Sequence, residues 1–377
     1  MEFKQIYSLA NQATKEALGE TAVLAEDLSN IVDVGTAVFN ANALDKYVKS
    51  LVDHIGKVIF VNRIYKMRAP SVLMDSWEYG QVCEKIRTEL PEATENDTWS
   101  LEDGTSYDEN VFKAPVVTAK FFDKRTTLEV DISITERQAR GAFSSPAQMG
   151  GFIAMIYTSI DNSLEIKNER LIMATVCSGI AETYNSDKTN GVKAVNLLSA
   201  YNTAKGTKLT AETALLDTDF IKYASYMILS YSDKMSCYSE LFNVNGTKKF
   251  TPKEDQKILL LSDFARRADF YLQSDTFHNE LTKLPAHENI QYWQGSGKDF
   301  SLANCSLVNV KTPSGADVNL PYVIGCIFDR ETLGVTNYDR RVTTKYNAKA
   351  EFTNFFYKVD AGYFLDLDEN MVVFYLA

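Results

Sequence analysis

The side chains of this 377-residue chain that could hold a metal ion are few. Its histidines are His54, His278 and His287, and the last two could share a metal ion with Glu280. No H-E-x-x-H segment accompanies them, so we favour solvated or hydrogen-bonded roles over a metal site. The histidine spacing therefore predicts no metal centre.

Two other segments partly match reaction motifs. GSGKD, which begins at Gly295, resembles the end of a phosphate loop, but the first glycine is missing and Asp299 replaces the magnesium-binding Ser or Thr. Asp366 and Asp368 could act as an acid and a base, yet in LDLDEN they alternate with leucines, which is typical of a half-exposed strand end. No G-x-S-x-G nucleophile segment occurs. We expect no enzyme and no cofactor.

Composition and charge narrow the class of protein further. The chain is 45% apolar and 24% charged, which predicts a folded protein. Its net charge of -11 argues against a protein whose main function is to bind nucleic-acid phosphates. The five cysteines are far apart without a C-x-x-C pair, so we expect small buried thiols in a reducing compartment. No apolar run approaches the roughly 18 residues of a membrane span, and the N-terminus lacks a signal-peptide core, so we expect synthesis and residence in a cytoplasm, without a membrane.

The first third of the chain predicts a docking helix and then a long two-stranded excursion. Apolar residues recur at three and four over 42–55, which predicts an amphipathic helix, and VIFVNRIYKM (58–67) predicts a strand. Val82, Ile86 and Leu90 share one face of the outgoing arm, and apolar residues alternate over 128–134 of the returning arm. Between the arms, Thr88 to Phe112 contains acids but no Lys or Arg, which predicts a turn-rich loop. An isolated ribbon is marginally stable, so another surface must cover it.

A long helix and a compact lobe follow. SPAQ at 145–148 fits a capping box, and the pattern predicts a helix over 146–184. The lobe, over 192–339, shows a helix near 219–229, an Asn245-Gly246 turn that suggests a hairpin, a buried strand KILLL with a helix opening after it, and a strand YVIGCIFD. Near the C-terminus, Phe355, Tyr357, Val359 and Ala361 alternate as in a strand, and a second strand, MVVFYLA, ends the chain.

Three of these segments together resemble the major capsid proteins of tailed double-stranded DNA bacteriophages. They are SPAQMGGFIAMIYTSIDNSLEIKNERLIMATV, LLLSDFARRADFYLQSDTFHNEL and DRETLGVTNYDRRVTTKYNAKAEFTNFFYKVDAGYFLDLDENMVVFYL. The resemblance implies an α+β fold of the Hong Kong 97 type, with the C-terminal strands packed on a long spine helix. The implied parts are an N-terminal arm (1–58), a peripheral domain (59–191 and 340–377) with a spine helix (146–184) and an extended β-hairpin loop (77–127), and an axial domain (192–339).

The resemblance implies a structural protein that self-assembles, through pentamers and hexamers, into the icosahedral head around phage double-stranded DNA. Each extended loop would lie across an adjacent subunit, and basic side chains would face the acidic loop of a neighbour. The expected contact residues are Glu92, Glu95, Asp97, Glu102, Asp103, Lys113, Lys120, Lys124, Arg125, Arg340 and Arg341. In some members of this class, a Lys–Asn isopeptide bond from the loop crosslinks the subunits of the shell. The tip of the loop here has no lysine, so we predict no such bond from it.

The implied partners are other copies, a portal protein and a separate scaffolding protein. The scaffolding protein is expected to be separate because the residues before the first strand are too few for a removable scaffolding segment. Packaged DNA would be held weakly and without specificity. The expected place is the virion capsid, assembled in the host bacterial cytoplasm. Two alternatives stay open: an encapsulin-like nanocompartment shell, and an α/β enzyme whose ribbon is a dimerisation arm. Neighbouring portal, terminase and tail genes would reject the first alternative, and an ordinary dimer in gel filtration would support the second.

Overall fold

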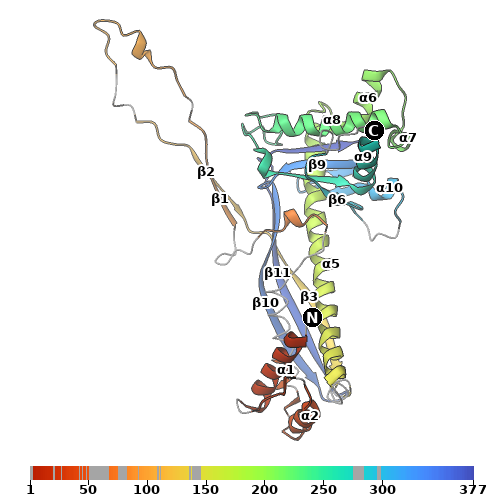
Figure 1. Ribbon diagram of the computed structural model, residues 1–377. Helices are drawn as coiled ribbons and strands as arrows, with labels where there is room; N and C mark the ends of the chain where they lie inside the picture. Colours follow the sequence, from red (N-terminus) through yellow and green to blue (C-terminus); the bar gives the residue numbers. More distant parts are fainter. Residues whose placement is uncertain are drawn as a thin grey trace. The chain divides into compact units, whose positions relative to one another are not determined.

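The structure is a computed structural model, and it describes residues 3–19, 22–26, 28–41, 43–44, 46–47, 49–50, 68–74, 83–91, 93–107, 110, 112–135, 137, 146–274, 284–294 and 299–377. The chain divides into two compact units (Figure 1). One unit is Trp77–Lys124, and the other combines Met1–Ser76 with Arg125–Ala377. We call the first the excursion and the second the body.

A three-stranded antiparallel sheet and one long helix form the first layer of the body. The strand order is β10 (Leu333–Asn347), β11 (Phe352–Leu365) and β3 (Arg125–Thr135). The alternating residues predicted for β11 are buried, and they pack on the apolar side of α5 (Pro146–Asp187), which runs beside the strands (Figure 1). The expected packing of the C-terminal aromatic strand on the spine helix is therefore observed. Alternation with period 2 puts one complete face of the strand in the core.

Two N-terminal helices complete this core. α1 (Phe3–Leu18) and α2 (Ile31–Asn40) contribute buried residues to the same cluster as α5, β3 and β11. Side-chain oxygens fix the connection between them, since Leu24 N donates to Asn11 (3.0 Å) and Ala25 N donates to Asn30 (2.8 Å). The helix expected over 42–55 and the strand expected over 58–67 lie for the most part outside the described residues.

A five-stranded sheet with both faces covered forms the second layer. Its order is β4 (Ala194–Asn196), β12 (Met371–Tyr375), β9 (Val323–Asp329), β5 (Gln256–Leu261) and β6 (Glu288–Ile290). Alternate residues of β5, β9 and β12 enter two different cores, one shared with α5 and the other with helices that include α8 (Thr218–Met235). Strands that are buried on both faces read as continuous apolar runs, as KILLL and MVVFYLA do.

The remaining described elements of the body are short helices, turns and a β-ribbon. They are η1 (Pro70–Val72), α6 (Leu197–Lys205), α7 (Ala211–Ala214), η3 (Lys253–Asp255), α9 (Ser262–Ser274), α10 (Leu302–Cys305), β7 (Val308–Lys311) and β8 (Asp317–Leu320).

The structure corrects several boundaries. Residues 125–127, expected in the loop 77–127, belong to β3, which pairs with β11 in the body and not with the outgoing arm. The last strand, expected in the peripheral domain, is β12 in the sheet of strands from 192–339. α5 continues past the predicted end at 184 to Asp187, whose carboxylate accepts from Lys193 N (2.6 Å) and Ala194 N (3.0 Å). That capping of the following turn explains the later end.

Two local predictions were wrong in detail. The Asn245-Gly246 turn exists, with Gly246 at φ 69°, but one isolated bridge between Ser239 and Lys249 replaces the expected hairpin strands. In LDLDEN, Leu365 ends β11 and residues 366–370 form the turn before β12; Asp366 is 2% exposed, not half-exposed. A turn aims its short acidic side chains at nearby backbone N–H groups: Asp368 N donates to Asp366 (3.1 Å).

Candidate assembly surfaces

The excursion contains a two-stranded ribbon with two chemically different faces. β1 (Cys83–Thr88) pairs antiparallel with β2 (Val117–Phe122). One face, which we call the apolar face, carries Ile86, Val117, Ala119 and Phe121, with Glu84 opposite Phe121 and Thr88 opposite Val117. Ile86 is 65% exposed, Phe121 64% and Val117 54%. Neighbouring exposed apolar side chains of this kind are typical of an interaction site.

The opposite face of the ribbon is basic. Lys85 lies directly opposite Lys120, and Arg87, two residues along β1, lies opposite Thr118. Residues two apart on a strand share a face, so Lys85, Arg87 and Lys120 form one cationic surface, which we call the basic face. All three side chains are partly exposed. The sequence already placed Lys85 and Arg87 together, but adding Lys120 required the register of the two strands.

The tip of the excursion, residues 88–112, is acidic and aromatic. Around η2 (Asp97–Trp99), Trp99 is fully exposed at 100%, and Phe112 is 89% exposed. Local hydrogen bonds shape the described part of the tip: Glu102 N donates to the Tyr107 hydroxyl (3.2 Å), and Thr105 N donates to the Glu102 carbonyl (3.3 Å). Large aromatic side chains held in water are favourable anchors for an interface.

The expected contact residues fall into two groups. Glu95, Glu102 and Asp103 are exposed at the tip, Asp97 lies in η2, and Lys120 lies on the basic face, with the exposed Lys113 and Lys124 on either side of β2 in the chain. Glu92 lies outside the described residues. Arg125, Arg340 and Arg341 lie in the body, on β3 and β10. The described acids of this set therefore all lie in the tip, whereas the basic residues lie partly in the excursion and partly in the body.

One basic residue of the body already has an acidic partner in its own chain. Arg341 Nη1 lies 2.5 Å and Nη2 3.2 Å from the Asp360 carboxylate, on the outer face of the β10–β11 pair. Hydrogen bonding from Arg341, and then from Thr127, holds the pKa of Asp360 below its ordinary value. Arg341 is therefore less suited than the residues of the excursion to bind a neighbour.

A basic residue that sequence reasoning missed fixes the chain before the excursion. The Arg68 guanidinium pairs with Glu169 of α5, donates to the Tyr292 carbonyl (2.6 Å) and stacks 3.7 Å from the centre of the Tyr292 ring. One residue before the end of the described segment 68–74, Leu73 bridges to Val335 of β10. These partners are 101 or more residues away in sequence, so no local pattern indicated them.

The residues that could have done chemistry are not gathered in the described part of the chain. His54, His278, Glu280 and Gly295 lie outside it, and the Nδ1 of His287 lies 2.8 Å from the Pro285 carbonyl. Asp299 accepts hydrogen bonds from Ser301 N and the Asn304 amide, as a surface turn would. Within the described ranges, no group of His, Cys, Asp or Glu is placed to hold a metal ion. Nor does any helix there have the length and apolar character to cross a membrane.

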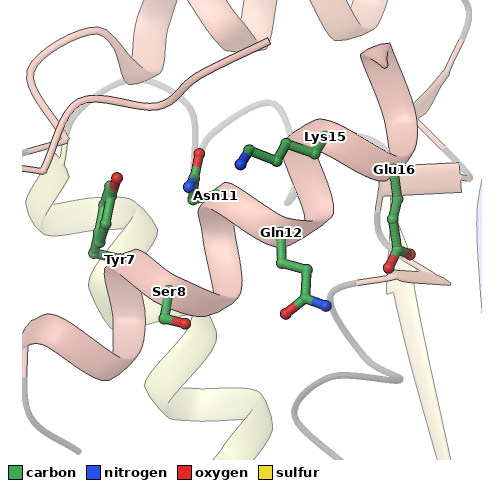
Figure 2. Close-up of a pocket in the computed structure, with 6 residues that line it drawn as sticks. All are labelled: Tyr7, Ser8, Asn11, Gln12, Lys15 and Glu16. Atoms are coloured by element: carbon green, nitrogen blue, oxygen red, sulfur yellow. The ribbon is translucent and has the colours of Figure 1, made fainter. Parts of the chain in front are cut away.

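The described part of the chain also contains four free thiols and a surface hollow. Cys177, Cys305 and Cys326 are buried free thiols as expected, and burial raises the pKa of Cys177 to about 12, whereas Cys237 is exposed, contrary to that expectation. The hollow is a separate feature, which lies along α1 (Figure 2). Its described lining consists of Tyr7, Ser8, Asn11, Gln12, Lys15 and Glu16. These side chains come from a single helix, and the oxygen of Asn11 is already engaged with Leu24 N.

Comparison with known proteins decides the class. The sequence model of the family described as "Phi29-like phage major capsid protein" matches residues 10–375. The chain belongs to this family. No curated protein matches the capsid protein's sequence.

Solved phage capsid structures resemble the capsid protein's fold. A chain from the capsid structure of Staphylococcus phage Andhra has a TM-score of 0.51 at 10% identity, over 84% of this chain and 86% of that one. A chain from the structure of the head fiber and inner core protein gp22 of native bacteriophage P68 has a TM-score of 0.50 at 10% identity, with the same coverage. The fold is thus of the Hong Kong 97 type, as predicted. The capsid role is confirmed, and neither the nanocompartment nor the enzyme alternative is supported.

Proposed function

We propose that this capsid protein builds the phage head by laying the excursion of each copy across a neighbouring copy, which covers the apolar face of the ribbon. The observation that carries the proposal is the exposure of that face, where Ile86 and Phe121 are each more than 60% exposed. Burying a large apolar side chain completely stabilises an interface by about 2 kcal/mol. Such contacts are heterologous, since two different surfaces meet, and they close into rings and shells when repeated.

The body would then form the wall of the shell. An axial domain, residues 192–339 together with β12, would surround the axes of pentamers and hexamers, and a peripheral domain around α5 would link them. The contact residues on β3 and β10 would supply further contacts between copies. The Hong Kong 97-type fold supports this arrangement, and the polar outer face of the β10–β11 pair is suited to a wetted contact.

The proposal includes three further partners: a scaffolding protein, a portal protein and packaged DNA. Leu9, Ala10 and Ala13 of α1 are buried in the core, so this helix is not suited to be a removable scaffolding segment, and a separate scaffolding protein would guide assembly in the host bacterial cytoplasm. A portal protein would occupy one vertex. The net charge of -11 supports weak, non-specific holding of packaged DNA. Since the tip lacks lysine, mature particles should give a single subunit band on a denaturing gel; a ladder of linked subunits would contradict this.

The test is assembly of a variant in which the apolar face is made polar. Ile86→Ser with Phe121→Ser should leave the chain folded but reduce the fraction that sediments as shells by about tenfold or more, because each interface loses two apolar contacts. Val23→Ser, at a position 60% exposed between α1 and α2, is the matched control and should assemble normally. Normal assembly of the double variant would contradict the proposal.

A further inference from the structure

A loop of the body presents several apolar side chains to solvent. It comprises residues 236–251, between α8 and η3, and we call it the aromatic loop. Tyr238 and Leu241 are each 53% exposed, and Phe250 is 50% exposed. Single exposed apolar residues are common on any protein surface, but three on one short loop are typical of an interaction site.

Two backbone hydrogen bonds fix the side of the loop that these residues occupy. Ser239 N donates to the Lys249 carbonyl (2.8 Å), and Lys249 N donates to the Ser239 carbonyl (2.9 Å). Residues beside a paired residue point to the opposite side, so Tyr238 and Phe250 share the side away from Ser239 and Lys249. The Lys249 side chain pairs with the buried Glu369 and so faces the body. Tyr238 and Phe250 therefore face solvent together.

The aromatic loop is held in place by its own chain. The Asn243 side chain accepts from Thr247 N (2.7 Å) and donates to the Thr247 carbonyl (2.5 Å). Val244 N donates to the Leu367 carbonyl (3.1 Å), and Phe242 is buried in the core that includes α8. A surface that is ordered in advance binds a partner without the entropic cost of ordering it. The exposed side of this loop is thus a preformed contact surface.

We infer that the aromatic loop is the surface of the neighbouring copy that covers the apolar face of the ribbon. The inference rests on the proposed function, which requires a covering surface on a neighbour but does not say where it lies. Tyr238 and Phe250 supply aromatic side chains, which are enriched at the centres of interfaces. The contact joins two different surfaces of each copy, so it can repeat from copy to copy around a ring.

The charges of the two surfaces also favour this partner. Glu240 and Lys248 are exposed on the same side of the aromatic loop as Tyr238, so that side carries no net charge. The apolar face of the ribbon includes one charged side chain, Glu84, at its edge opposite Phe121. Two surfaces with so little charge lose little hydration of charged groups when they meet. A nucleic-acid backbone fits the loop less well, because its binding depends on clustered cations.

Cysteine crosslinking tests which surfaces meet. Cys237 is an exposed thiol beside Tyr238, and Ala119→Cys places a second thiol in the middle of the apolar face. In shells treated with a short bismaleimide, this variant should give linked subunits that are absent from Ala119→Cys with Cys237→Ser. Thr118→Cys, on the opposite face of the same strand, is the matched control and should form several-fold fewer links to Cys237. Equal linking from both faces, or none from Ala119→Cys, would overturn the inference.

A double substitution tests what the loop contributes to assembly. Tyr238→Ser with Phe250→Ser should reduce the fraction that sediments as shells by about tenfold, because each interface loses two apolar contacts. Thermal unfolding of the unassembled chain should be nearly unchanged, since both side chains are about half exposed. Tyr226→Ser with Leu229→Ser removes two exposed apolar side chains from α8 and, as the matched control, should assemble normally. Normal assembly of the loop variant would contradict the inference.

The inference and the proposed function fail separately. If the apolar-face variant loses assembly but the loop variant assembles normally, the ribbon crosses a neighbour at another surface. If the loop variant loses assembly but Cys237 does not link to the apolar face, the loop binds a different partner and the inference is wrong. If the apolar-face variant assembles normally, the proposed function itself has failed.

Discussion

Lys85 and Lys120 lie directly opposite each other in the β1–β2 ladder. Assembly that uses them should weaken as sodium chloride rises, because exposed charges are screened beyond about 10 Å at 0.1 M salt. Lys85→Gln with Lys120→Gln should assemble less well at low salt and show a flatter salt dependence. Light scattering at several salt concentrations measures both. An identical salt slope in the two proteins would show that this pair takes no part in assembly.

The alternation of β11 predicts opposite effects for two adjacent phenylalanines. Phe355 is fully buried between the sheet and α5, whereas Phe356 lies on the outer face of the same strand. Phe355→Ala should lower the free energy of unfolding by about 3–5 kcal/mol, through lost burial and a cavity. Phe356→Ala should cost about 1 kcal/mol. Denaturant unfolding of the unassembled protein compares them, and equal losses would mean that the strand does not present its odd-numbered face to the core.

A buried ion pair fixes the long loop after α8. Lys249 pairs with Glu369, and their side chains are 12% and 5% exposed, respectively. Glu369→Ala should lower the free energy of unfolding by about 3–5 kcal/mol, because it removes the carboxylate that pairs with a largely buried ammonium group. The matched control is Asp233→Ala, whose partner Lys253 is exposed, and it should cost about 0.5 kcal/mol. Thermal unfolding should separate the two variants clearly; a similar small shift in both would refute the burial of the first pair.

Asp360 gives a dependence on pH. Its folded-state pKa lies below its unfolded value because Arg341 hydrogen-bonds the carboxylate. The contribution of the Asp360 carboxylate to the stability of the folded state is therefore complete above the unfolded-state pKa. It is lost as pH falls through the lower folded-state pKa. Asp360→Asn should remove about 1 kcal/mol at neutral pH and flatten the loss of stability between about pH 5 and pH 2. Asp131→Asn, on the same outer face, is the control and should keep the acid-side slope.

Local patterns predicted much of the body. The alternation in 355–361 predicted which face of β11 is buried, Pro146 marked the start of α5, and the apolar run at 257–261 predicted β5, because each of these signals arises from residues within one element. The resemblance in the spine helix and the final strands predicted the fold type.

What the sequence did not reveal depends on pairing between distant segments. The alternation in 128–134 is equally compatible with a ribbon and with a sheet in the body, and only the pairing of Ile132 with Phe355 decides between them. The basic face likewise depends on the register that brings Lys120 opposite Lys85. Asp366 looked half-exposed because alternation was read through a turn, where side-chain directions no longer follow the strand period.

The most direct test of the account is side-chain footprinting by hydroxyl radicals on unassembled protein and on purified shells. We predict that Phe121, together with Ile86 of the same face, is modified rapidly in the unassembled protein and protected several-fold in shells, because a neighbouring copy covers it. Phe356 should change less and serves as the internal reference. Equal modification of Phe121 in the two states would contradict the claim that one copy completes the apolar surface of another.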